Sequence, residues 1–73
     1  MAIKVARFVD GNIQTKNLGE SSSCYRVWGS VRKGEDKWLI YYADGRLADT
    51  LGEQTKDDAI NRGMAMAMAL GDK

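Results

Sequence analysis

The sequence predicts an α+β fold: a small antiparallel β-sheet of four to five strands with one C-terminal α-helix packed on one face. The densest run of β-forming residues, Trp38–Tyr42, is followed by Asp44-Gly45, a dipeptide favoured in tight type I′ hairpin turns. Asp10-Gly11 marks a second such turn nearer the start of the chain. Beyond Thr55 the pattern becomes helical. The 73 residues (1–73) form one domain with a thin core, because a domain this small buries only about 60% of its unfolded surface.

Five runs have strand character, being rich in β-branched and aromatic residues or alternating between apolar and polar ones. They are residues 3–9, 12–15, 24–32, 38–42 and 46–51. Gly29 interrupts the third run, and a glycine inside a strand indicates a bulge or a close approach of two backbones. Residues 16–23, with three consecutive serines, are predicted to form a mobile loop.

The last element is predicted to be a helix over residues 56–70. Thr55 provides its N-cap, because a threonine hydroxyl can accept a hydrogen bond from a backbone N–H three residues further on. Asp57 and Asp58 place negative charge in the first turn, where the helix dipole favours it.

The methionines of this helix fall on two sides. With 3.6 residues per turn, Met64 and Met68 share one face, and Met66 shares the opposite side with Leu70. One sheet can bury only one stripe of a helix. We therefore expect Met64 and Met68 to fill the core, and Met66 and Leu70 to face a partner or, as an alternative, a second copy of the chain in a homodimer.

The sheet face away from the helix is a second candidate surface. If Val27, Ile40 and Tyr42 point inward, six side chains tend outward: Arg26, Trp28, Arg32, Leu39, Tyr41 and Arg46. Aromatic rings interleaved with arginine are typical of surfaces that bind protein or nucleic acid. Simple solvation of exposed charge explains the same pattern equally well.

The composition argues against catalysis. The chain has no histidine and one cysteine, Cys24, and it contains no phosphate loop, zinc spacing or nucleophile elbow. Most acidic residues fall in turns and caps; only Asp49, on the last strand, has no assigned role. We expect a non-enzymatic protein without a cofactor or metal. No apolar run is long enough to span a membrane, so a soluble, cytoplasmic protein is expected.

Part of the sequence resembles a family of DNA-binding domains. The segment Lys37-Trp38-Leu39-Ile40-Tyr41-Tyr42, followed by Asp44-Gly45-Arg46 and Thr55-Lys56-Asp57-Asp58-Ala59, resembles the arm-type DNA-binding domains of phage integrases. That resemblance covers about half of the chain and implies a sheet that binds the DNA major groove. The net charge of +1 is lower than is usual for that family.

As a whole, the chain is similar in size and make-up to small host-takeover proteins of bacteriophages. Among these it resembles the transcription regulators that bind bacterial RNA polymerase, such as that of a Xanthomonas phage. The resemblance implies inhibition of initiation by displacement of the σ factor, together with antitermination. Anti-CRISPR proteins have the same profile and are an alternative.

These observations lead to two hypotheses. The first is a phage-type regulator that binds subunits of host RNA polymerase through Arg7, Arg26, Trp28, Tyr41, Met66 and Leu70. The second is a small DNA-binding module that uses Arg26, Trp28, Arg32, Tyr41 and Arg46. The two differ in their expected response to salt, because only contacts with phosphate release counterions.

Overall fold

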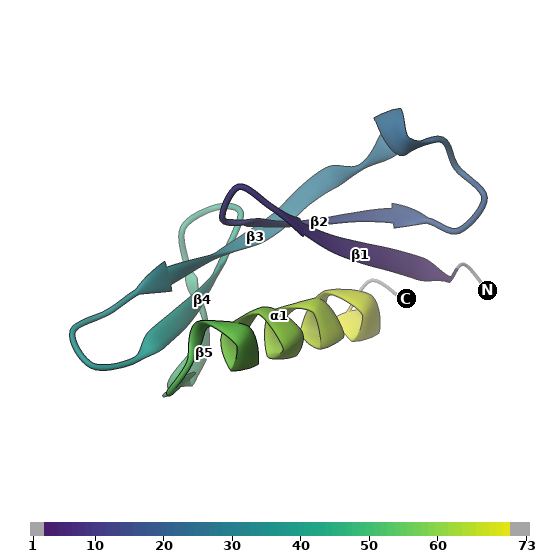
Figure 1. Ribbon diagram of the computed structural model, residues 1–73. Coiled ribbons are helices and arrows are strands. Elements are labelled where there is room, and N and C mark those ends of the chain that lie inside the picture. Colours follow the sequence, from purple (N-terminus) through teal and green to yellow (C-terminus); the bar gives the residue numbers. More distant parts are fainter. Residues whose placement is uncertain (1–2, 71–73) are drawn as a thin grey trace.

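The computed structural model describes residues 3–70, and the side chains of residues 50, 51 and 70 lie outside that description. A five-stranded antiparallel sheet, in which each strand pairs with the next in sequence, is followed by one helix packed on one face, which confirms the predicted fold (Figure 1). The elements are β1 (Lys4–Val9), β2 (Asn12–Asn17), the 3-10 helix η1 (Ser22–Cys24), β3 (Arg26–Lys33), β4 (Trp38–Tyr42), β5 (Leu47–Glu53) and α1 (Lys56–Leu70).

The first hairpin turn has the predicted geometry. Asp10 and Gly11 have φ angles of 51° and 84°, and the flanking Val9 and Asn12 pair directly. A type I′ turn requires positive φ at both central residues, which aspartate and glycine tolerate. The dipeptide therefore sets the register between β1 and β2.

The second hairpin differs from the expectation. Only Gly45 has positive φ there, at 94°. The backbone N–H of Tyr42 donates to the carbonyl of Arg46 at 2.8 Å, so the loop contains three residues, 43–45. The predicted type I′ turn at Asp44-Gly45 is therefore wrong. A three-residue loop with glycine in the left-handed position connects these strands instead.

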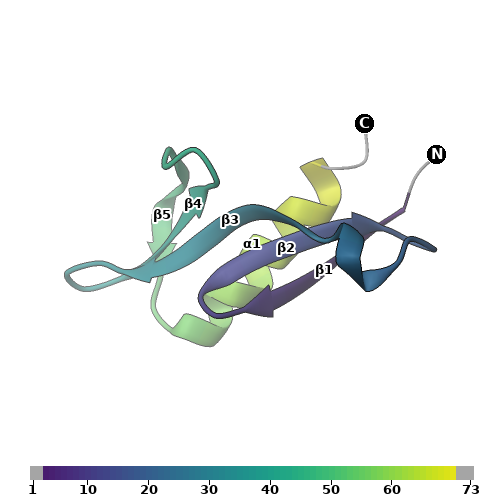
Figure 2. The same cartoon turned by 90° about the horizontal axis from the view of Figure 1, so that it is seen from above.

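The long strand β3 joins two halves of the sheet. Residues 26–30 pair with β2 and residues 29–33 pair with β4, so the two halves overlap only at Gly29 and Ser30. Figure 2 shows β3 running from its hairpin with β4 past β2 and β1. The molecule is consequently elongated, with extents of 38 × 23 × 21 Å.

A bulge in β3 changes which side chains face the helix. Ile13 pairs with Gly29 and Gln14 pairs with Val27, so Trp28 is an extra residue in β3. A bulge interrupts the simple alternation of side chains along a strand. Trp28 packs against the buried core, whereas Val27 is 47% exposed. The predicted placement of Val27 inward and Trp28 outward is therefore wrong.

The helix begins where the sequence predicts. Thr55 Oγ1 accepts a hydrogen bond from the backbone N–H of Asp58 at 3.1 Å, and α1 covers residues 56–70. This cap satisfies one of the four N–H groups that have no partner within a helix.

A stripe of small residues lets α1 lie close to the sheet. Ala59, Gly63 and Ala67 recur every four residues and are buried, so they share one face of the helix. A Cβ atom on Gly63 would collide with Ile13 and lie 3.6 Å from Ile40. Ile13 and Ile40 are fully buried beneath this stripe and form the centre of the core.

The exposure of the methionines in α1 follows from the position of this stripe. Relative to Gly63, Met66 lies about 60° around the helix axis and Met68 about 140°. Met64 and Met66 are partly buried against the core, whereas Met68 is 41% exposed. The expectation that Met66 points away from the sheet and Met68 fills the core is therefore wrong. The side chain of Leu70 lies outside the described residues.

The predicted loop is shorter than expected. β2 continues to Asn17 and η1 begins at Ser22, so only residues 18–21 lie between the two elements. The carboxylate of Glu20 accepts a hydrogen bond from the backbone N–H of Asn17 at 2.8 Å, which closes the turn. The predicted bounds of 16–23 are therefore wrong at both ends.

One carboxylate is buried under the helix. Asp49 is only 6% exposed, and the Nε atom of Arg62 donates to its Oδ2 atom at 3.0 Å. The same Nε atom lies 3.4 Å from Oε1 of Glu53. Asp49 thus holds β5 against α1.

Candidate functional site

The sheet face opposite α1, called the outer face below, carries the candidate site. Ile13 and Ile40 are buried beneath α1, so the alternation along each strand places their neighbours on the outer face. Its polar and aromatic residues on β1 to β4 include Arg7, Gln14, Lys16, Arg32 and Tyr41. The four strands β1 to β4 contain no aspartate or glutamate. The outer face of these strands therefore has cations without an acidic neighbour on the same strands.

The first group of outer-face residues, called the Arg7 cluster, consists of Arg7, Gln14, Lys16 and Tyr25. The Cζ atom of Arg7 lies 3.7 Å from the centre of the Tyr25 ring, and Nζ of Lys16 lies 5.5 Å from it. The Nε atom of Arg7 donates to Oε1 of Gln14 at 2.8 Å. The ring face attracts both cations, and the amide fixes the plane of the guanidinium.

The second group, called the Arg32 cluster, consists of Arg32 and Tyr41. The Cζ atom of exposed Arg32 lies 5.3 Å from the centre of the Tyr41 ring, at a distance typical of a cation–π contact. Leu39 pairs with Arg32 on the neighbouring strand and extends this part of the outer face. Each half of the sheet thus carries its own cation and aromatic ring.

Of the residues predicted from the sequence, Arg7, Arg32 and Tyr41 lie on the outer face. Trp28 lies on the helix side, where its ring meets Tyr42 edge to face with centroids 5.4 Å apart. Arg26 pairs with Thr15, which the alternation along β2 also places on the helix side. Tyr25 was missed because side chains were counted in strict alternation along the third strand, through the bulge that Gly29 indicates. Lys16 was missed because it was assigned to the loop over residues 16–23, whereas β2 continues to Asn17.

Arg46 belongs to a turn and to neither cluster. Its Nε atom donates to Oδ2 of Asp44 at 2.7 Å, and its backbone N–H donates to Oδ1 at 3.0 Å. This backbone N–H, and then the guanidinium, hold the pKa of the Asp44 carboxyl below its ordinary value. A nucleic acid would therefore have to compete with Asp44 for Arg46.

Acidic residues gather away from the outer face of β1 to β4. In the described part of the chain they occupy loops, the helix side of β5 and the first turn of α1. They are Asp10, Glu20, Glu35, Asp36, Asp44, Asp49, Glu53, Asp57 and Asp58. The net charge of +1 therefore does not describe the outer face of β1 to β4, where Arg7, Lys16 and Arg32 have no acidic residue on the same strands.

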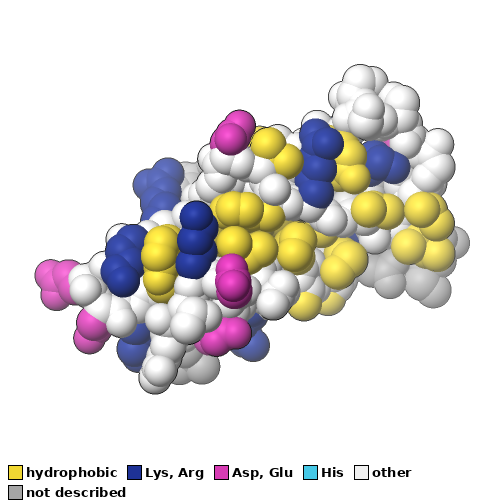
Figure 3. All heavy atoms as spheres, in the orientation of Figure 1, with side chains coloured by type: hydrophobic (Ala, Val, Ile, Leu, Met, Phe, Trp, Pro, Cys, Tyr) yellow, Lys and Arg dark blue, Asp and Glu magenta, His cyan; other side chains and the backbone are white. Residues whose placement is uncertain are grey.

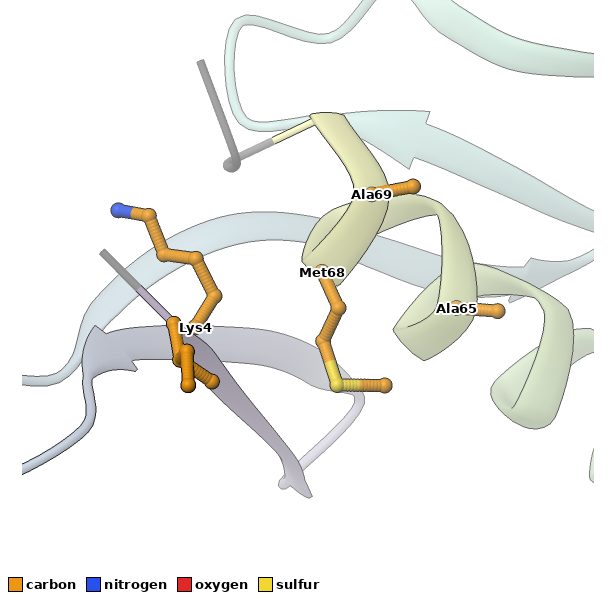
Figure 4. Close-up of a pocket in the computed structure, with 5 residues that line it drawn as sticks. Lys4, Ala65, Met68 and Ala69 are labelled. Carbon is orange, nitrogen blue, oxygen red and sulfur yellow. The ribbon is translucent and has the colours of Figure 1, made fainter. Parts of the chain in front are cut away.

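An apolar surface lies at the end where β1 begins. Ile3, Lys4, Ala65, Met68 and Ala69 line an open hollow of about 450 Å³, in which Lys4 and Met68 project from two different elements (Figure 4). Figure 3 shows hydrophobic side chains gathered along α1 and at this end of the molecule. Close by, the N–H of Leu18 donates to the carbonyl of Ile3 at 2.7 Å; these two side chains are 63% and 62% exposed.

Comparison with known protein families, with curated proteins and with solved structures gives no match for this chain. Within residues 3–70 no group of three or more histidine, cysteine or acidic side chains is arranged to hold a metal ion. No helix in that range has the length and apolar character needed to cross a membrane.

Proposed function

We propose that this protein binds nucleic acid through the outer face of its sheet. The observation that carries the proposal is the set of three cations, Arg7, Lys16 and Arg32, on strands that contain no acidic residue. A phosphate backbone is attracted to such a surface whatever its base sequence. The net charge of +1 does not oppose this, because most of the negative charge is displaced to loops, β5 and the start of α1.

The spacing of the two clusters supports an extended ligand. Val27, which lies opposite Gln14 of the Arg7 cluster, is five positions from Arg32 along β3. At about 3.3 Å per residue this separation is roughly 17 Å. A small anion contacts only one of the clusters, whereas a nucleic-acid strand is long enough to contact both. Protein rings beside each cation restrict its motion and lower the entropic cost of binding.

Salt dependence tests the proposal. Binding of a fluorescently labelled DNA duplex is expected to weaken with added salt, with a slope of log K against log salt of about −2 to −3 for two or three phosphate contacts. The double variant Lys16→Gln/Arg32→Gln is expected to reduce the size of that slope by about 2, because each lost contact removes about 0.9. Fluorescence anisotropy at several salt concentrations measures both values.

Lys33→Gln is the matched control for this experiment. Lys33 pairs with Trp38 on the helix side of the sheet, and its Nζ atom lies 5.2 Å from the centre of a Trp38 ring. Its removal changes net charge without touching the outer face, so the slope should stay as in the wild type. The control removes one charge and the double variant removes two. A reduction of the slope by the control that is half of the reduction by the double variant would show that binding follows total charge, and it would contradict the proposal.

A second candidate, a regulator that binds bacterial RNA polymerase, is favoured by the exposed apolar side chains of Ile3, Leu18 and Met68. Such side chains suit a protein partner better than a phosphate backbone. Under this hypothesis, purified polymerase retains the tagged protein after nuclease treatment, and Leu18→Glu/Met68→Glu abolishes retention. Loss of retention on nuclease treatment alone would instead leave nucleic-acid binding as the explanation.

A further inference from the structure

We infer that Arg7 reads guanine in the major groove of duplex DNA. The inference rests on the proposed function and adds to it a residue that distinguishes one base from the others. It follows from the way three side chains from different segments hold a single guanidinium: Arg7 on β1, Gln14 on β2 and Tyr25 just before β3.

Arg7 is held in place before any ligand arrives. Its guanidinium lies 3.7 Å from the centre of the Tyr25 ring, which restrains it from one side. The hydrogen bond from Nε to Gln14 then fixes its rotation within that plane, since Gln14 is directly opposite Arg7 in the register of β1 and β2. None of the ion pairs in the described part of the chain involves Arg7.

The two terminal nitrogens of Arg7 are left to bind a ligand. A guanidinium has five N–H donors, and the Nε–H is used by Gln14. The remaining fork matches a planar pair of acceptors, which either a backbone phosphate or the major-groove edge of guanine supplies. A flexible cation is sufficient for a phosphate, and Lys16 beside the same ring provides one. Because Arg7 is held in one orientation, it suits a ligand whose two acceptors also have a fixed orientation. This favours the guanine edge.

The tyrosine rings of the outer face are covered by cations of the protein, and this favours duplex DNA over a single strand as the ligand. Single-strand binders stack bases on open aromatic faces. On the outer face, cations of the protein itself lie over both Tyr25 and Tyr41. Duplex RNA fits poorly, because its major groove is too deep and narrow for side chains to read. The groove of B-DNA is wide enough for a two-stranded β-ribbon such as the β1–β2 hairpin.

Chemically altered duplexes test this inference. The probes are a G·C-rich DNA duplex, the same duplex with every guanine replaced by deazaguanine, which lacks the ring-nitrogen acceptor of the major-groove edge, and the same duplex with inosine, which retains both acceptors. We expect wild-type affinity to be equal for guanine and inosine and about tenfold lower for deazaguanine. Arg7→Met should lower the affinity for the guanine duplex by about tenfold and remove the discrimination, since methionine keeps an unbranched side chain but has no hydrogen-bond donor.

Arg26→Met is the matched control, because Arg26 belongs to the helix side of β3 and its loss removes the same charge; this variant should keep full discrimination. Melting curves of both variants verify that they are folded. Equal affinity of the wild type for the guanine and deazaguanine duplexes, or full discrimination by Arg7→Met, would overturn the assignment of Arg7. If the duplexes bind equally but with the steep salt dependence given above, the proposed function stands without this inference. If no duplex binds, both fail.

Discussion

Replacing Gly63 with leucine is expected to lower the free energy of unfolding by about 3 kcal/mol or more, because the added atoms have no room. Even a Cβ atom at this position would collide with Ile13, which is fully buried and cannot move into solvent. A domain of 73 residues has a total stability of about 4–11 kcal/mol, so the variant loses a large share of it. Urea unfolding followed by tryptophan fluorescence measures the difference.

Ala65→Leu is the control for this prediction. Ala65 is two residues away on the same helix but is exposed, so a larger side chain there should change stability by less than about 0.5 kcal/mol. If Gly63→Leu were as stable as Ala65→Leu, the close packing of α1 on Ile13 and Ile40 would be wrong.

Replacing Gly29 with alanine is expected to destabilise the sheet by about 2–3 kcal/mol. A Cβ atom at Gly29 would collide with the backbone carbonyl oxygen of Tyr41 and lie 3.5 Å from the Cα atom of Tyr42. A backbone atom cannot rotate away as the end of a side chain can, so β3 and β4 have to separate locally. The same separation would displace Tyr41 and weaken the Arg32 cluster.

Near-ultraviolet circular dichroism and thermal melting check the Gly29 prediction, because the Trp28–Tyr42 ring pair lies beside the site. Ser30→Ala changes the next residue of the same strand and should leave both signals close to the wild type. A Gly29→Ala variant with unchanged melting temperature would contradict the close approach of the two strands.

Local chemistry made several elements predictable. Asp10-Gly11 specifies a two-residue turn because both residues tolerate positive φ, and Thr55 marks the helix start because its hydroxyl caps an N–H group. Gly29 also carried a correct signal, since both a bulge and a close backbone approach occur there. The turn and the cap depend on residues close together in the sequence, whereas Gly29 indicates an irregularity without showing which residue is the extra one.

The faces of β3 were not predictable in this way. Counting alternate residues from Val31 places Tyr25 and Val27 toward the helix, but the extra residue Trp28 reverses the alternation at that point. The location of a bulge depends on pairing with a distant strand, which the sequence of β3 alone does not reveal. Tyr25 was therefore missed, although it is the ring that holds Arg7.

The buried face of α1 was predicted wrongly for a related reason. Its large residues suggested that the methionines define the buried face, whereas the small residues around Gly63 define it, because they allow close contact with Ile13 and Ile40. Likewise Asp49 had no predicted role, since its partner Arg62 is brought near only when α1 packs on the sheet. Packing between segments that are distant in the sequence determines both the buried face of α1 and the role of Asp49.

The outer face of β1 to β4 carries a local positive charge from Arg7, Lys16 and Arg32, although the net charge of the chain is only +1. Salt screens charge over about 8–10 Å, so a local patch of this kind attracts a polyanion mainly when the outer face is already close to it. Under the proposed function, encounter with DNA gains from correct orientation at contact, and release from sites that do not fit the outer face is fast.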